Sequence, residues 1–206
     1  MVEMEPTKLE TTKLETVPGV SVLLGWAPGT EAGSRIRQLA KAILAERLEI
    51  DAAFVNVQRE APVQFGHHTR LIAVVDGREV PLMVRTASFR TASVVAVFEP
   101  TRLVGLDIRA RQADEAALHE IRAHSHLWGS SFWQEATDES LVVHWSRVQA
   151  VRQADPRGVS IRPEAVRLDP PFAKAWAPER KDAFHLVDLS TGAYVITLAY
   201  GTVATE

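Results

Sequence analysis

The sequence predicts an α+β fold with mainly antiparallel sheets, and three observations lead to this prediction. Short apolar runs with period-2 alternation are interleaved with stretches of helical periodicity. Hairpin turn signals, such as Asp76-Gly77 and Ser190-Thr191-Gly192, outnumber connections that could cross over between parallel strands. The plan of strands, helix and hairpins recurs loosely in the second half, which predicts two similar α/β halves.

Composition and charge narrow the class of protein. With 206 residues, 46% hydrophobic and 24% charged, the chain is typical of a soluble globular protein with a sizeable core. The formal net charge of -3 gives no basic field for nucleic acid. The absence of cysteine excludes disulfides and thiolate sites and indicates a reducing cytoplasm. No apolar run approaches ~18 residues, so no membrane span is expected, and Glu3 and Glu5 make the N-terminus unlike a secretory signal.

The first half is expected over residues 19–102. Before it, residues 1–18 hold a polar tandem repeat, Thr-Lys-Leu-Glu-Thr twice, which predicts a flexible leader or an edge extension. Ser34 is the expected cap of a helix that ends near residue 50. Alternation predicts strands at residues 20–26, 54–57, 71–75, 81–84 and 93–98.

The second half is expected over residues 103–206. Helical spacing predicts helices at residues 115–123 and 141–154, the second ended by Pro156 and Gly158. Strands are expected at residues 159–161, 165–168, 184–189 and 193–200, the last two forming a hairpin.

The central run Val104-Gly105-Leu106-Asp107-Ile108-Arg109 is the first candidate site. Alternation places Leu106 and Ile108 on one face of a strand, and Asp107 and Arg109 on the other. A glycine beside this polar pair lets a ligand or another backbone approach closely. The alternative interpretation is a half-buried strand with a solvated polar face.

Three segments, in this order, resemble the Sfp-type 4′-phosphopantetheinyl transferases. They are Val-Gly-Leu-Asp-Ile at 104–108, Trp-Ser-Arg-Val-Gln-Ala-Val at 145–151, and Phe-His-Leu-Val-Asp-Leu at 184–189 followed by Gly-Ala-Tyr-Val at 192–195. The resemblance covers roughly residues 20–201. It implies two similar α/β halves, with coenzyme A and magnesium in the cleft between them.

The resemblance also implies a chemistry, and this chain departs from it. The family holds magnesium with Asp-x-Glu or Asp-x-Asp and with the glutamate of a Trp-x-x-Lys-Glu-Ala helix. Asp107 matches the first carboxylate and is the metal ligand if the family's magnesium site survives. Arg109 stands at the second carboxylate, and Val148-Gln149 stands at Lys-Glu. An arginine beside a divalent cation is repulsive, and glutamine is a poor base.

The phosphate-binding positions are altered as well. The next lysine of the helix falls at Gln153, or at Arg152 in a register shifted by one residue. Ala87-Ser88 stands at the family's Ser-His pair, flanked by Arg85 and Arg90. Gly66-His67-His68 corresponds to the Gly-Lys-Pro loop.

Three hypotheses follow. The favoured one is a repurposed enzyme acting on a polyketide or peptide natural-product intermediate in the cleft, without magnesium or coenzyme A. Its expected catalytic residues are Asp107, Arg109 and Gln149; the expected substrate-binding residues are Arg85, Ser88, Arg90, Trp145 and Arg152. The second is an active transferase that loads a carrier protein from coenzyme A and magnesium, with Glu135, Asp138 or Glu139 replacing a lost carboxylate. The third is a non-catalytic protein that binds a carrier protein. In each case a cytoplasmic monomer is expected.

The remaining candidates are expected to be structural. His67-His68, and His119 with His124 and His126, lack the partners of a zinc site. The aromatic cluster indicates core packing, or alternatively the wall of an apolar pocket: Trp128, Phe132, Trp133 and Trp145. Ser130-Ser131 lacks a Gly-x-Ser-x-Gly elbow. An alternative interpretation of Arg109, Arg111 and Arg122 is that they are surface charges.

Overall fold

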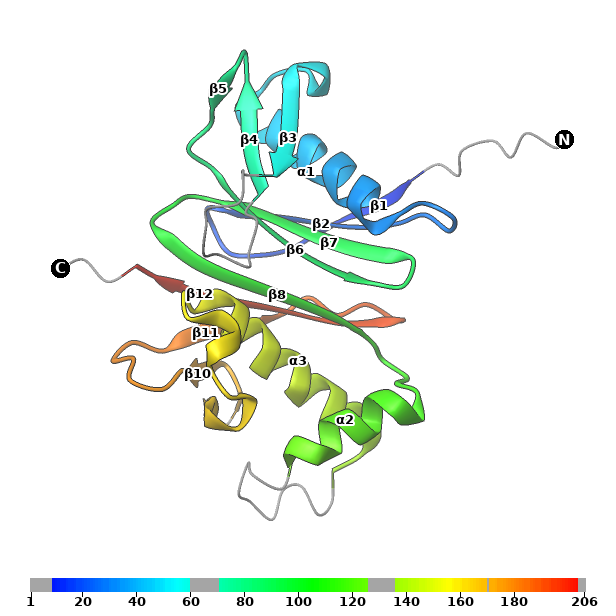
Figure 1. Ribbon diagram of the computed structural model, residues 1–206, viewed down its shortest axis with the longest axis vertical. Helices are drawn as coiled ribbons and strands as arrows, with labels where there is room; N and C mark the ends of the chain where they lie inside the picture. Colours follow the sequence, from blue (N-terminus) through cyan, green and yellow to red (C-terminus); the bar gives the residue numbers. More distant parts are fainter. Residues whose placement is uncertain (1–8, 60–70, 126–135, 170, 204–206) are drawn as a thin grey trace, which may run out of the picture. The chain divides into compact units, whose positions relative to one another are not determined.

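Antiparallel sheets and helices make up the structure, a computed structural model that describes residues 9–59, 71–125, 136–169 and 171–203 (Figure 1). This confirms the predicted α+β class with mainly antiparallel sheets. The chain divides into two compact units, residues 1–100 and 101–206, where the sequence analysis placed the division after residue 102. Within the described residues, none of the helices combines the length and apolar character needed to cross a membrane.

The sheet of the first unit has the order β1-β2-β7-β6-β4-β3, with β5 paired to β4. Its strands are β1 (Glu10–Leu14), β2 (Val20–Trp26), β3 (Val55–Arg59), β4 (Leu71–Val75), β5 (Arg78–Glu79), β6 (Met83–Phe89) and β7 (Ala92–Phe98). Helix α1 (Ala32–Leu48) packs on β2, β3 and β7, and a 3₁₀ turn (Ala52–Phe54) follows it. The cluster beneath α1 includes Leu39, Ile43, Val95 and Val97.

Local details of this unit differ from the predictions. Residues 10–14 form an edge strand that pairs with β2. Of the two alternatives predicted for this segment, these residues therefore follow the edge extension and not the flexible leader. Helix α1 begins before Ser34, with Glu31 as its N-cap residue and no side-chain cap bond. The predicted strand at 81–84 is displaced, since β6 begins at Met83 and continues to Phe89 along β7.

The sheet of the second unit has the order β8-β12-β11-β10-β9. Its strands are β8 (Arg102–Ala110), β9 (Arg167–Asp169), β10 (Lys174–Trp176), β11 (Phe184–Asp188) and β12 (Tyr194–Thr202). Helix α3 (Asp138–Ala154) packs on β8 and β12, and α2 (Glu115–Ser125) packs on α3. Figure 1 shows α3 lying along this sheet with α2 beside it.

Two predicted strands of this unit are partly or wholly wrong. Residues 158–160 form a 3₁₀ turn that Ile161 closes by donating its N–H to the Gly158 carbonyl, so no strand forms at 159–161. A second 3₁₀ turn begins at Pro163, whose fixed φ suits the first position of a helix, so that β9 starts only at Arg167.

The two units share one strand order. In each, the first central strand pairs antiparallel with the last: β2 with β7, and β8 with β12. The penultimate strand comes next, β6 or β11, followed by two earlier strands. A helix packs on that central pair in each unit, α1 in the first and α3 in the second. The internal repeat predicted from the sequence is therefore present as a repeat of topology.

Both faces of the central strands are buried. All seven residues of β7 are buried, which explains why it is a continuous apolar run and not an alternating one. The same holds for the middle of β8, where Val104, Leu106 and Asp107 are all buried.

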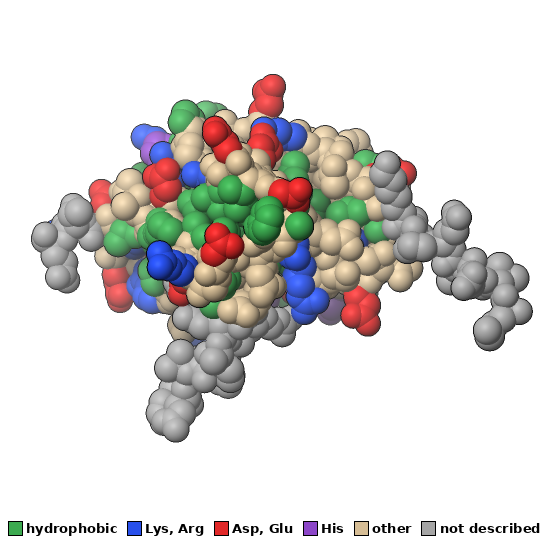
Figure 2. Space-filling view, turned by 90° about the horizontal axis from the view of Figure 1, so that it is seen from above, with side chains coloured by type: hydrophobic (Ala, Val, Ile, Leu, Met, Phe, Trp, Pro, Cys, Tyr) green, Lys and Arg blue, Asp and Glu red, His purple; other side chains and the backbone are tan. Residues whose placement is uncertain are grey.

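On the face of the molecule that Figure 2 shows, hydrophobic side chains gather centrally, with acidic and basic side chains interspersed around them.

Candidate functional site

The polar face of β8 lies beneath helix α3. A β carbon on Gly105 would lie 2.0 Å from the Ala150 carbonyl oxygen and 2.5 Å from the Ala154 nitrogen, so this position admits only glycine beneath the helix. The close approach that Gly105 allows is therefore made by the protein's own helix. Asp107, two residues on, is only 5% exposed, so the alternative of a solvated polar face is wrong for this carboxylate.

Asp107 and Arg109 form a two-pronged ion pair. Arg109 Nε donates to Asp107 Oδ2 at 2.9 Å, and Arg109 Nη2 donates to Oδ1 at 3.2 Å. Burial raises the pKa of Asp107 above its usual range, while the Arg109 charge and hydrogen bonds from Arg109 and Ser146 oppose that rise. Period-2 alternation thus brought the two side chains to one face, as the sequence predicted, and the guanidinium contacts both carboxylate oxygens.

A buried chain of hydroxyl groups continues from this pair. Thr197 on β12 is the cross-strand partner of Asp107. Ser146 of α3 donates its hydroxyl to Thr197 Oγ1 at 3.0 Å and also lies within hydrogen-bonding reach of Asp107. Asp107, Ser146 and Thr197 are all buried. Neither hydroxyl was singled out from the sequence, although Ser146 lies within the segment that carries the family resemblance.

Gln149 and Arg152 contact one another further along α3. Arg152 Nη1 donates to Gln149 Oε1 at 2.8 Å, and Arg152 Nε donates to the Ile161 carbonyl at 2.7 Å. Burial lowers the pKa of Arg152, and the nearby Glu164 opposes that shift. These hydrogen bonds join α3 to the turn after it and do not link Gln149 to the Asp107–Arg109 pair.

Trp145 belongs to the core. It is 2% exposed, packs with Leu118, Leu141 and Val142, and stacks on His124 with ring centroids 5.2 Å apart. The core-packing interpretation therefore describes Trp145. Its predicted substrate-binding role stays a prediction.

Arg85, Ser88 and Arg90 belong to the first unit. The Ser88 and Ser93 hydroxyl oxygens are 2.9 Å apart, and Arg35 Nε donates to Ser93 Oγ at 3.2 Å. Arg35, 2% exposed, also donates to the carbonyl of Arg90 at 2.7 Å. Ser88 thus belongs to a hydrogen-bonded network that joins α1 to β6 and β7. Burial lowers the pKa of Arg85.

The other sequence candidates are scattered or lie outside the described residues. The candidates that lie outside the described residues are His67, His68, His126, Trp128, Ser130, Ser131, Phe132, Trp133 and Glu135. Of the proposed replacement carboxylates, Asp138 pairs with Arg122 and Glu139 with Arg111. In the part of the chain that the structure describes, no three His, Asp or Glu side chains are grouped so that they could hold a metal ion.

The structure adds a hollow around Arg147 that the sequence analysis missed. Two cavities of about 210 and 330 Å³ share Val143, Arg147 and Phe172 in their linings. The Arg147 guanidinium carbon lies 5.2 Å from the centre of the Phe172 ring, a cation–π distance. Burial lowers the pKa of Arg147, and the charge of Asp188 opposes that shift. Thr197 lines the smaller cavity, so the hydroxyl chain from Asp107 ends there.

His144 lines the larger cavity. It is 7% exposed, and burial together with the Arg147 charge lowers its pKa to about 3. Its imidazole is therefore neutral near pH 7, and Arg147 is the cation that both cavities share. The sequence held no local signal for this hollow, since Phe172 lies 25 positions beyond Arg147 and meets it only in the folded chain.

A comparison of the chain with protein-family models and with curated proteins finds no match.

Proposed function

We propose that this protein is an enzyme with a phosphopantetheinyl transferase-like fold that acts on an anionic polyketide or peptide intermediate without magnesium–coenzyme A chemistry. The observation that carries the proposal is the pair of buried Asp107 and partly exposed Arg109, in which the guanidinium contacts both oxygens of the carboxylate.

This pair opposes a magnesium ion at Asp107. Magnesium requires oxygen ligands in near-octahedral geometry. To bind here it would have to displace Arg109 from both oxygens while the guanidinium stays nearby. At about 4 Å and an effective dielectric of about 20, the repulsion between a divalent ion and a guanidinium is about 8 kcal/mol. Gln149, held by Arg152, supplies no compensating charge.

The hollow around Arg147 has the features of a small-molecule site. Its cation is partly desolvated, which strengthens attraction to a carboxylate or phosphate group. Val143 and Phe172 offer apolar surface to the rest of the ligand. The linings also include Asp188 and Glu139, and Glu139 is paired with Arg111. An organic anion with an apolar body matches a partly desolvated cation beside apolar surface.

In this proposal the buried chain supplies acid–base chemistry. Arg147 binds the anionic group, Thr197 faces the ligand, and Asp107 exchanges a proton with it through Ser146. The raised pKa of Asp107 makes its carboxyl group a better proton acceptor than a solvent-exposed aspartate. The reaction class is an isomerisation or cyclisation, in which a proton is moved and no net oxidation occurs.

Two measurements test the proposal. The first titrates coenzyme A with and without magnesium, and then measures the mass of an apo carrier protein after incubation. We expect no magnesium-dependent binding and no gain of phosphopantetheine mass. Binding with a mass gain would overturn the proposal in favour of an active transferase, and binding of the carrier protein alone would favour a non-catalytic partner.

The second measurement uses octanoate as a probe of the hollow. We expect octanoate to bind to the wild-type protein by isothermal titration, and the dissociation constant to rise at least tenfold in R147Q. R122Q, which removes an exposed arginine of α2, is the matched control and is expected to stay within twofold. Equal binding of octanoate by R147Q and the wild type would show that Arg147 does not bind the anionic group, and would overturn the hollow as the ligand site.

A further inference from the structure

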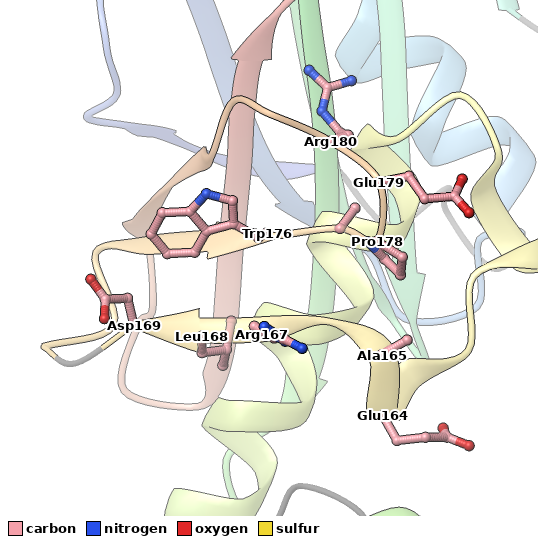
Figure 3. A pocket seen from close by; sticks show the side chains of 10 residues that line it. Glu164, Ala165, Arg167, Leu168, Asp169, Trp176, Pro178, Glu179 and Arg180 are labelled. Atoms are coloured by element: carbon pink, nitrogen blue, oxygen red, sulfur yellow. The ribbon is translucent and has the colours of Figure 1, made fainter.

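A third cavity lies at the β9–β10 end of the second unit's sheet. Its volume is about 830 Å³, within the range of roughly 300–1,000 Å³ typical of ligand pockets. It is lined by residues 164–165, by strand β9 and by residues 176–180, and Figure 3 shows these side chains. It shares no lining residue with the two cavities around Arg147.

Trp176 and Arg167 form the centre of this cavity. They are cross-strand partners in the β10–β9 pairing, so their side chains project from the same face of the sheet. Figure 3 shows the indole of Trp176 above β10, with Arg167 on the neighbouring strand. The indole is only partly buried, which leaves aromatic surface for a planar ligand.

The acidic residues of the lining are offset by cations outside it. Each of its three acidic residues has a cationic neighbour outside the cavity: Glu179 Oε2 lies 3.1 Å from Arg157 Nη1, and the charge of Glu164 acts on Arg152. Asp169 is the cross-strand partner of Lys174. The cations of the lining itself are Arg167 and Arg180.

Arg180 adds an unsatisfied donor to the lining. Its guanidinium carbon lies 4.7 Å from the centre of the Phe184 ring, and its Nη2 donates to the Thr202 carbonyl at 3.4 Å. Its Nε is buried and has no hydrogen-bond partner among the described residues. A buried donor without an acceptor is unfavourable, and an anionic oxygen is a strong acceptor for it.

From these observations we infer that the cavity between Trp176, Arg167 and Arg180 binds an anionic aromatic small molecule, an aryl carboxylate, sulfonate or phosphate. The indole stacks on the aromatic ring, and the Arg167 guanidinium together with Arg180 Nε binds the anionic group. This site is independent of the one proposed at Arg147.

The experiment uses 1-anilinonaphthalene-8-sulfonate, an aromatic sulfonate whose fluorescence rises on binding, with the full chain. We expect saturable binding whose dissociation constant rises at least tenfold in R167Q and in W176L. K181Q is the matched control, because exposed Lys181 adjoins the lining without belonging to it, and it is expected to stay within twofold. Circular dichroism of each variant verifies that it is folded.

Two further arms separate this site from general adsorption and from the hollow at Arg147. Naphthalene-1-sulfonate is expected to displace the probe at least tenfold more effectively than uncharged 1-naphthalenemethanol. R147Q is expected to leave the affinity for the probe unchanged. Absence of saturable binding, equal binding by R167Q and W176L, or a loss in R147Q comparable to that in R167Q would overturn the inference.

Discussion

Lowering the pH is expected to destabilise the second unit through His144. Burial and the Arg147 charge lower the pKa of this imidazole from 6.5 to about 3. The unfolded chain therefore binds a proton at His144 at pH values where the folded chain does not. The associated stability is present above pH 6.5 and is lost as the pH falls toward 3.

The size of the loss follows from the two pKa values. Between about pH 6 and pH 4 the contribution changes by about 1.4 kcal/mol per pH unit, the value for one proton. From pH 7 to pH 4.5 this amounts to about 2.5 kcal/mol. The value at pH 4.5 is set mainly by the unfolded pKa, because the folded pKa lies well below the pH of the measurement.

Urea unfolding of the wild type and H144Q at pH 7, 6, 5.25 and 4.5 measures this loss. The wild type should lose about 2.5 kcal/mol more than H144Q across the series, whatever the difference between the two proteins at pH 7. H119Q, at an exposed position of α2, is the matched control and should follow the wild type. Parallel curves for the wild type and H144Q would refute a buried neutral imidazole at this position.

Two further predictions concern the contact between β8 and α3. G105A should destabilise the protein by at least about 3 kcal/mol, because its β carbon would lie 2.0 Å from the backbone oxygen of Ala150. G25A should cost less, since the nearest atoms to its β carbon belong to the flexible side chains of Leu39, at 2.7 Å, and Leu9, at 3.2 Å. Urea unfolding of both variants makes the comparison. R109Q should cost about 3 kcal/mol by leaving the Asp107 carboxylate buried without its guanidinium, and D107N combined with R109Q should recover more than half of that loss. An R109Q variant as stable as the wild type would show that the pair contributes nothing to folding.

The sequence alone determined the elements whose signal is local. The strands at residues 20–26 and 71–75 match β2 and β4, because alternation and the flanking turn residues are properties of neighbouring positions. The same alternation placed Asp107 and Arg109 on one face of a strand, where they form their ion pair. The strand expected at 159–161 failed because Gly158 favours a 3₁₀ turn that the apolar residues after it do not reveal.

Only the tertiary structure determined which element packs against each face of a strand or helix. Helix α3, more than thirty residues further along the chain, covers Gly105 and Asp107 and turns an expected solvated face into a buried polar chain. The hollow at Arg147 forms only where segments distant in sequence converge. A sequence pattern specifies the direction of a side chain relative to its own strand or helix. Its burial, and therefore its charge state and its partners, depends on which other element packs against that face.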